Sequence, residues 1–179
     1  MIEPTTDMGP TGADDANSSE PGLIEPAWID ARGPKLQQVY HYWRSKSRDG
    51  KLPRRSDIDP IDIPRLLPNL MIVEVVEDAR RYVYRLVGTK EVEMRGRDPT
   101  GLSVIDGFLG PSFEDALSFY DRTVQSRAPV FDDKPYISSN GRWISDETLF
   151  LPLSENGLRI DRILVFAASS PYQKPRRVP

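Results

Sequence analysis

The residue types that most often carry chemistry in proteins are scarce in this chain of 179 residues, which has no cysteine and a single histidine, His41. Disulfides, thiolate nucleophiles, thiolate zinc sites and iron–sulfur clusters all require cysteine sulfur, so the composition excludes them. A metal site built from several histidines, or an acid–base pair built from two, is excluded because only one imidazole is present. The chemistry that remains possible would use carboxylates and tyrosines.

Two groups of carboxylates have the spacing of a site without its other requirements. Asp57, Asp59 and Asp62 suggest a calcium loop, but no glycine follows at the required place and no glutamate closes the run. Helix capping explains Asp59 more simply, because a proline follows it. Asp146 and Glu147 are adjacent, and adjacent residues of a strand face opposite sides of a sheet. We therefore predict that the chain is not an enzyme, although an enzyme using carboxylates and tyrosines stays formally open.

Six basic residues follow one another closely, with Asp49 as the only acidic residue among them. The run could contact a nucleotide phosphate, a nucleic acid or an acidic partner surface. The simpler interpretation is a solvated loop, and the acidic N-terminal segment could fold back on it. The formal net charge of −3 argues against a nucleic-acid binder, which needs a strong basic excess. The six residues are Arg44, Lys46, Arg48, Lys51, Arg54 and Arg55.

Aromatic and apolar residues from two segments could line a small-molecule pocket. Buried tyrosine hydroxyls supply the few polar groups that orient a ligand in apolar surroundings. The alternative is a core filled by the same side chains, and we favour it on spacing alone because every small domain needs such a core. The candidates for the ligand site are Tyr82, Tyr84, Leu86, Phe113, Leu117 and Tyr120.

Residues 35–46 are predicted to form an amphipathic helix that begins after Gly33 and Pro34. Its apolar stripe has two possible locations, either the outer face of the domain's own sheet or a second copy of the chain. His41 is either a pH-responsive contact in such an interface or, more simply, a surface histidine. The stripe, and so the candidate interface, consists of Leu36, Val39, Tyr40 and Trp43.

Two β-rich segments, residues 70–76 and 81–87, are separated by four small or polar residues and are predicted to form a hairpin. Side chains alternate between the two faces of a strand, so Tyr82, Tyr84 and Leu86 share one face. We expect this face to point inward.

The rest of the chain predicts helices followed by three strands. Residues 88–107 combine short helical segments with turn signals, and a longer helix capped by Ser112 follows. Residues 129–138, 142–153 and 158–168 are strand candidates separated by Asn-Gly pairs, which favour tight hairpin turns. The order predicts an α+β fold in which one five-stranded antiparallel sheet is covered by helices on one face.

The two ends of the chain differ in composition from the middle. Residues 1–30 contain seven acidic and no basic residues, and we expect a disordered acidic tail over residues 1–33. Residues 171–179 form a second tail, which is basic and rich in proline. A single domain then spans residues 35–170. The N-terminus lacks a signal-peptide pattern, and no apolar run approaches the length of a membrane span, so we expect a cytoplasmic protein without membrane contact.

Six short segments stand in order along the chain: Tyr42-Trp43-Arg44, Leu52 to Pro60, Ile63 to Pro68, Tyr84 to Thr89, Gly96 to Gly101, and Glu147 to Ser154. In this order they resemble the PAS fold, and more specifically the short stand-alone PAS family common in alphaproteobacteria. The resemblance implies a five-stranded antiparallel sheet with its helices inserted between strands two and three.

The resemblance also implies a sensory or protein-interaction module, in which the inner sheet face and the long helix enclose a pocket for a small ligand. Members of the family usually lack an attached output domain. The signal would then pass through a protein partner or a homodimer, and the resemblance leads us to expect a homodimer. The alternative is a purely structural adaptor with a filled core and no ligand.

The cofactor, if there is one, stays unknown, but the composition narrows the choice. Flavin photosensors of the LOV type and coumaric-acid photoreceptors both need a cysteine, which the chain lacks. Haem-binding PAS domains generally use an axial histidine from the helical face of the core. His41 lies on the predicted N-terminal helix outside that core, so we do not expect histidine-ligated haem.

Overall fold

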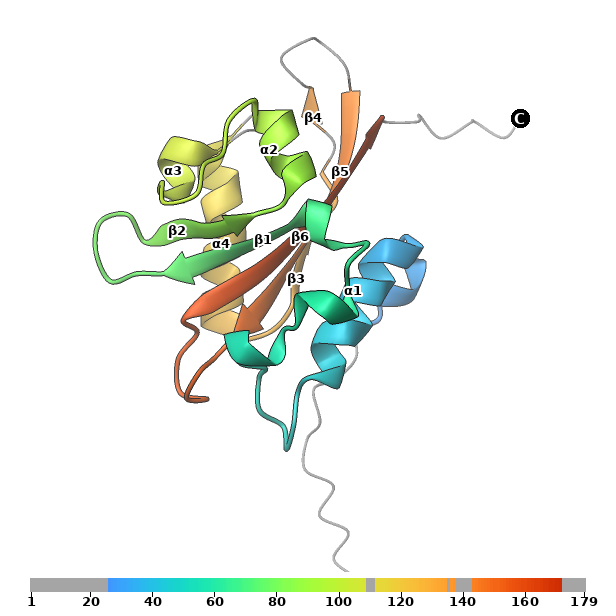
Figure 1. The fold of residues 1–179 in the computed structure, drawn as a ribbon, viewed down its shortest axis with the longest axis vertical. Helices are drawn as coiled ribbons and strands as arrows, with labels where there is room; N and C mark the ends of the chain where they lie inside the picture. Colours follow the sequence, from blue (N-terminus) through green and yellow to red (C-terminus); the bar gives the residue numbers. More distant parts are fainter. Residues whose placement is uncertain (1–25, 109–111, 135, 138–142, 172–179) are drawn as a thin grey trace, which may run out of the picture.

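One antiparallel sheet runs through the centre of the molecule and carries helices on both faces (Figure 1). The computed structural model describes residues 26–108, 112–134, 136–137 and 143–171. The α-helices are α1 (Pro34–Ser45), α2 (Thr89–Arg95), α3 (Val104–Gly107) and α4 (Phe113–Ser126). The strands are β1 (Leu70–Val75), β2 (Tyr82–Val87), β3 (Val130–Asp132), β4 (Tyr136–Ile137), β5 (Trp143–Leu153) and β6 (Arg162–Pro171). Short 3-10 helices are η1 (Ile29–Ala31), η2 (Arg55–Asp57), η3 (Pro60–Asp62) and η4 (Leu67–Asn69).

The strands lie in the order β2-β1-β6-β5-β3, and each neighbouring pair is antiparallel. The short strand β4 also pairs with β5, so β3 and β4 share one edge position of the sheet. The predicted strand 129–138 is divided because the Asp132 carboxylate accepts the backbone N–H of Lys134 (3.0 Å), which turns the chain. The α+β prediction is otherwise confirmed, with five strand positions and the helices between the second and third.

The two faces of the sheet are covered by different helices. Phe150 of β5 stacks on Phe119 of α4 with ring centroids 5.6 Å apart, and we call the face that carries Phe150 the inner face. Leu149 and Leu151 alternate with Phe150 and point to the opposite, outer face. Helix α1 contacts β5 and β6; in Figure 1 it lies on the right of the sheet, the segment that follows it passes in front of the strands, and α4 lies behind them. The sheet is therefore buried on both sides.

Helix α1 packs its whole apolar stripe onto the outer face of its own sheet. The indole N–H of Trp43 donates to the carbonyl of Pro152 (3.0 Å), which joins the helix to β5. Of the two locations considered for the stripe, this chain uses the intramolecular one, and contact with a second copy through these residues would require α1 to leave the sheet. The buried residues of the stripe are Leu36, Val39, Tyr40 and Trp43.

The predicted inward position of Leu86 is wrong, because β2 contains a bulge. Ile72 of β1 pairs with Leu86, whereas the next residue, Val73, pairs with Tyr84, so Arg85 is extra. The extra residue reverses the alternation, which places Leu86 on the outer face with a side chain that is 39% exposed. Tyr82 and Tyr84, on the other side of the bulge, are buried as predicted.

The described structure differs from the predicted boundaries at two places. Residues 26–33 fall in the predicted tail, yet Ile29 is fully buried and Trp28 stacks on Phe131 of β3 (5.3 Å). Leu158 was predicted to begin the last strand, but it is 82% exposed in the connection between β5 and β6. There the Asn156 side chain accepts the Leu158 N–H (2.9 Å), which extends the turn and delays β6.

Two predicted helix caps are confirmed by hydrogen bonds. Ser112 accepts the backbone N–H of Asp115 (3.1 Å) at the start of α4, and Asp59 accepts that of Ile61 (2.9 Å) at the start of η3. Among the described residues, no helix has the length and apolar character needed to span a bilayer.

Truncation of Trp43 to alanine should lower the free energy of unfolding by about 3–5 kcal/mol, because the ring is fully buried between α1 and β5. Urea unfolding monitored by circular dichroism measures the change. Gln38→Ala, on the exposed side of the same helix, is the matched control and should change stability by less than about 0.5 kcal/mol. Equal effects of the two substitutions would show that α1 does not pack on the sheet in solution.

Candidate ligand site on the inner face of the sheet

Four of the six residues proposed for a ligand site meet between the inner face and α4. The Tyr82 and Tyr120 rings lie 5.0 Å apart, and Tyr84 and Leu117 are buried beside them. The other two do not join the group. Leu86 lies on the outer face because of the bulge, and Phe113, at the first turn of α4, is 42% exposed.

The aromatic rings of this group contact one another directly. Tyr120 meets Phe150 edge to face at 5.0 Å, in addition to its contact with Tyr82. Helix α3 comes close to the same group at Gly107, where an added Cβ would lie 2.9 Å from the Tyr84 ring. A side chain at this position would push α3 away from the sheet. Side chains therefore fill much of the space between α3, α4 and the strands.

A buried ion pair on α2, which the sequence analysis missed, faces the same layer. Arg95 Nη1 lies 2.7 Å from Glu91 Oε2, and the two side chains are 8% and 2% exposed. Their i, i+4 spacing in the sequence is typical of a helix-surface pair. Nothing in the local sequence indicates that this side of α2 faces the protein interior, so the pattern alone favoured a solvent-exposed pair.

Arg95 has more hydrogen-bond donors than the surrounding protein satisfies. Nη1 donates to Glu91, while Nη2 lies 3.7 Å from the weakly accepting sulfur of Met71. Nε is buried and has no acceptor among the described residues. An unsatisfied buried donor typically costs about 1–3 kcal/mol, so its presence needs an explanation. The guanidinium also lies 5.8 Å from the Tyr84 ring, which places it against the tyrosine group.

The ionisation of this cluster follows from its burial. Burial raises the pKa of Tyr84 above its usual value, although nearby Arg95 offsets part of the rise. Burial also raises the pKa of Tyr120 well above its usual value, and Tyr84 adds to the effect. Burial, the largest single effect, lowers the pKa of Arg95, but hydrogen bonding to Glu91 and the interactions with Tyr84 together raise the pKa above its usual value, so the guanidinium stays charged. The cluster thus contains protonated hydroxyls and a cation, and Tyr84 interacts by hydrogen bonding with both Arg95 and Tyr120.

The rim of the site joins the β1–β2 hairpin to α4. Arg81 forms an ion pair with Asp121 of α4, and the Tyr82 hydroxyl donates to the same carboxylate. Burial and the hydrogen bond to Asp121 raise the pKa of Tyr82. Within the described ranges, no cluster of three or more histidine, aspartate or glutamate side chains is arranged to hold a metal ion.

Replacing Glu91 by glutamine should destabilise the fold by about 3–5 kcal/mol, because it leaves the Arg95 charge buried without its counter-ion. Glu91→Leu combined with Arg95→Met removes both charges and should recover most of this loss. Urea unfolding of the three chains gives the comparison. Glu93→Gln, on the exposed side of α2, is the control and should be close to neutral. A Glu91→Gln effect no larger than the control's would mean that water solvates the pair.

The buried tyrosines should resist ionisation in the folded chain. Their folded pKa lies above the unfolded value of about 10, so stability is unaffected below pH 10 and falls as the pH rises above it. A tyrosinate absorbance titration should therefore show fewer than the seven tyrosines ionising before unfolding, and all seven in urea. Tyr84→Phe should leave the native part of the curve unchanged. A smaller native signal in that variant would place Tyr84 in contact with solvent.

Comparison with known proteins connects this geometry to a family. Residues 31–166 match the PAS domain family. This range includes helices α1 to α4, strands β1 to β5 and the first half of β6. None of the curated proteins matches the chain.

Solved structures with a similar arrangement have low sequence identity. The LOV domain of a blue-light activated histidine kinase from Erythrobacter litoralis is 13% identical, with a TM-score of 0.44 over 57% of this chain and 95% of that one. The PAS domain of an HTR-like protein from Haloarcula marismortui is 19% identical, with a TM-score of 0.40 over 62% and 90%. The match to the family covers most of the chain with its sheet and both helical layers, and the protein belongs to the PAS domain family.

Proposed function

We propose that this PAS domain is a sensor that binds a small ligand between its inner sheet face and helices α2, α3 and α4. Membership of the family supports a sensory signalling role in general. The observation that carries the finer proposal is Arg95, a buried cation whose Nε lacks an acceptor beside two buried tyrosine hydroxyls. A buried polar group without complete hydrogen bonding is rare in folded proteins and calls for an explanation, and buried groups with perturbed pKa values are concentrated at functional sites.

The donor-rich cluster determines the kind of ligand that would fit. Arg95 Nε offers an N–H donor without an acceptor, beside the hydroxyls of Tyr84 and Tyr120, while the surrounding rings and Met71 are apolar. A small molecule with an apolar body and one carbonyl or carboxylate group would complete the hydrogen bonding of Nε. Since the rings already contact one another, entry requires the short helices α2 and α3 to move outward.

A movement of the inner layer can be transmitted through β5 to the opposite face of the sheet. Phe150 contacts the ligand layer, whereas its neighbours Leu149 and Leu151 lie on the outer face beneath α1. A ligand that favours one packing of the inner layer would therefore shift the population of α1 arrangements. We propose that a protein partner or a second copy of the chain responds to α1.

The direct ring contacts favour a second candidate, a structural adaptor without a ligand. In that case the core is complete, and the protein acts only through its surfaces. Tyr82, Tyr120 and Phe150 at centroid distances of 5.0 Å are the observation that supports this alternative. The two candidates differ in one measurable property, which is the presence of a small molecule in the folded protein.

Native mass spectrometry of the purified full chain should detect a non-covalent small molecule, which organic extraction then releases for identification. Arg95→Met should lose the molecule, because the donor that holds its acceptor group is gone. Arg97→Met, an exposed arginine two positions along, is the control and should retain it. The same spectra give the oligomeric mass. A folded chain that is free of any small molecule when purified from its own cells would support the adaptor instead.

A further inference from the structure

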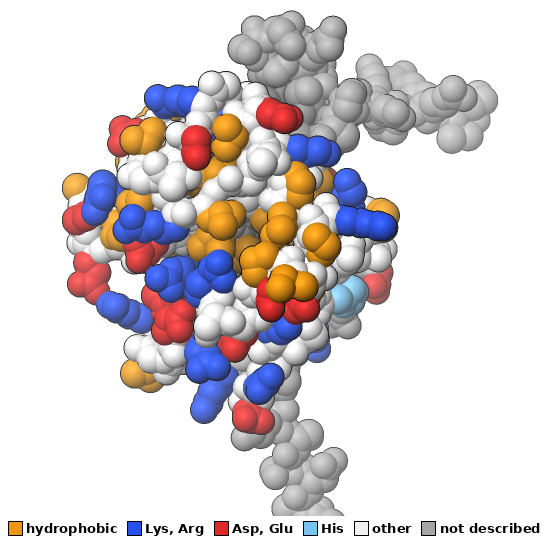
Figure 2. All heavy atoms as spheres, viewed as in Figure 1, with side chains coloured by type: hydrophobic (Ala, Val, Ile, Leu, Met, Phe, Trp, Pro, Cys, Tyr) orange, Lys and Arg blue, Asp and Glu red, His pale blue; other side chains and the backbone are white. Residues whose placement is uncertain are grey.

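A groove of about 280 Å³ lies on the surface between the segment that follows α1 and the turn that joins β5 to β6. Its cationic lining comes from the first of these segments, and the turn 154–157 supplies the opposite wall. We call it the basic groove. Figure 2 shows several Lys and Arg side chains, with Asp and Glu side chains among them, over the lower part of this face, where the connection after α1 runs in Figure 1. The four cationic residues of the groove are Lys46, Arg48, Lys51 and Arg54.

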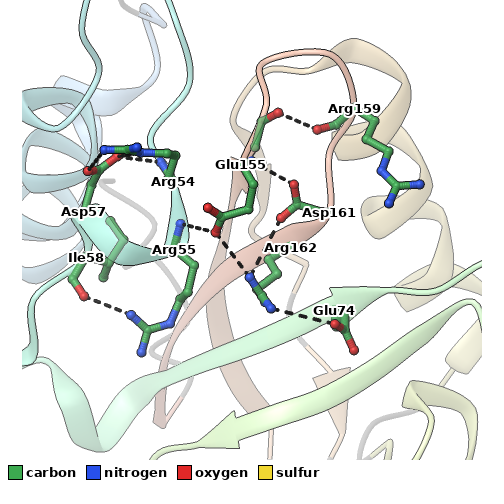
Figure 3. A network of polar contacts seen from close by, with 10 residues as sticks. Arg54, Arg55, Asp57, Ile58, Glu74, Glu155, Arg159, Asp161 and Arg162 are labelled. Carbon is green, nitrogen blue, oxygen red and sulfur yellow. Dashed lines mark hydrogen bonds and ion pairs between the residues drawn. The ribbon is translucent and has the colours of Figure 1, made fainter.

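The walls of the basic groove are held together by a polar network (Figure 3). The backbone N–H of Arg55 donates to Glu155 Oε1 (3.1 Å), and the backbone N–H of Ser154 donates to the carbonyl of Pro53 (2.9 Å). Arg162 of β6 lies 3.3 Å from the same Glu155 carboxylate. These bonds fix the β5–β6 turn against the segment after α1, so the groove is a preformed surface.

Two of the four cations already have carboxylate partners. Lys46 lies 2.8 Å from Asp62, and Arg54 lies 3.1 Å from Asp57. Of the other carboxylates that line the groove, Glu155 is engaged by Arg162, and Asp49 lies at the turn of a small hairpin.

The remaining two cations, Arg48 and Lys51, face each other across this hairpin, which closes at Asp49 and Gly50 with positive φ angles of 52° and 68°. Both residues are exposed. No described side chain forms a hydrogen bond or an ion pair with either of them. The hairpin therefore displays two exposed cations that form no ion pair with a described side chain, although the charge of Arg48 contributes to lowering the pKa of Asp57. Charge-assisted bonds to carboxylates are the interaction that these cations favour.

The chain itself contains a segment of matching charge. Residues 1–25 carry six acidic side chains and no basic one, whereas residues 26–171 carry 21 of each and are neutral overall. The N-terminal segment is thus the main concentration of negative charge in the chain. The six acidic residues are Glu3, Asp7, Asp14, Asp15, Glu20 and Glu25.

The distance between the segment and the groove is short compared with the segment's length. Residue 26 precedes α1 and the basic groove follows it, so the two are separated by a helix of 12 residues, about 18 Å long. An extended chain of 25 residues spans up to about 80–90 Å. Because the segment is tethered, its effective concentration at the groove is of millimolar order, which allows weak ion pairs to bind.

We propose that the basic groove is the docking surface of the chain's own acidic segment, residues 1–25. Docking places negative side chains beside Arg48 and Lys51 and brings the segment against the C-terminal end of α1. An acidic surface of another protein would compete for the same place, so the segment acts as an internal competitor. This contact is independent of any ligand on the inner face.

The absence of cysteine allows a direct test on the full chain. Ser18→Cys provides one site for a nitroxide spin label within the segment, and the label broadens amide signals of nearby residues in a ¹⁵N-labelled chain. The expected result is a loss of at least about half of the signal intensity for residues 47–52 and 154–157. High salt should restore these signals, because exposed ion pairs are screened.

Arg48→Glu combined with Lys51→Glu should also restore the signals, while leaving the spectrum of the folded domain otherwise intact. Lys90→Glu combined with Arg97→Glu, two exposed cations on α2 and just beyond it, is the matched control and should leave the broadening unchanged. Broadening spread evenly over the domain, or insensitive to the Arg48 and Lys51 reversal, would overturn the proposal. A second experiment mixes a spin-labelled chain at natural nitrogen abundance with a ¹⁵N-labelled chain that carries no spin label. If the broadening occurs only between the two chains of this mixture, the contact belongs to a second copy, and the proposal is overturned.

Discussion

The strand pair β5–β6 is apolar on both faces, and this property determines most of the architecture. Phe150 and Val165 face inward while Leu149 and Phe166 face outward, and all four are buried. Burying a large apolar side chain stabilises the fold by about 1.5–3 kcal/mol, so neither face of this pair can be left in water. The sheet therefore needs two covering layers, α1 with the residues before it on the outer face and α2 to α4 on the inner face.

The inner layer covers an apolar sheet face, and it also buries an ion pair. A seven-residue helix, α2, places Glu91 and Arg95 where the surroundings are aromatic rings and Met71. A buried ion pair is seldom more stabilising than apolar residues of the same volume, because desolvation of both charges opposes their attraction. Stability alone does not account for the pair, and the Nε donor of Arg95 has no acceptor among the described residues.

The outer layer is formed mainly by α1, which lies between two segments of opposite charge. The helix is anchored by Trp43, is preceded by an acidic segment, and is followed by a connection whose cations line a groove. The acidic segment and the cations that follow the helix carry opposite charges, and such charges attract each other when the tether allows them to approach. A contact of this kind would be weak and sensitive to salt, which suits regulation better than stabilisation.

The sequence by itself determined the features that depend on local pattern: the α1 stripe with Trp43, the Ser112 cap, the order of helices and strands along the chain, and the resemblance to the family. Features that depend on how distant segments meet required the tertiary structure. The bulge that turns Leu86 outward arises from the pairing of β2 with β1, which the sequence of neither strand indicates. The burial of Glu91 and Arg95 arises because the inner layer encloses an i, i+4 pair that is normally found on a helix surface. Side-chain environment is a property of packing, and local pattern does not contain it.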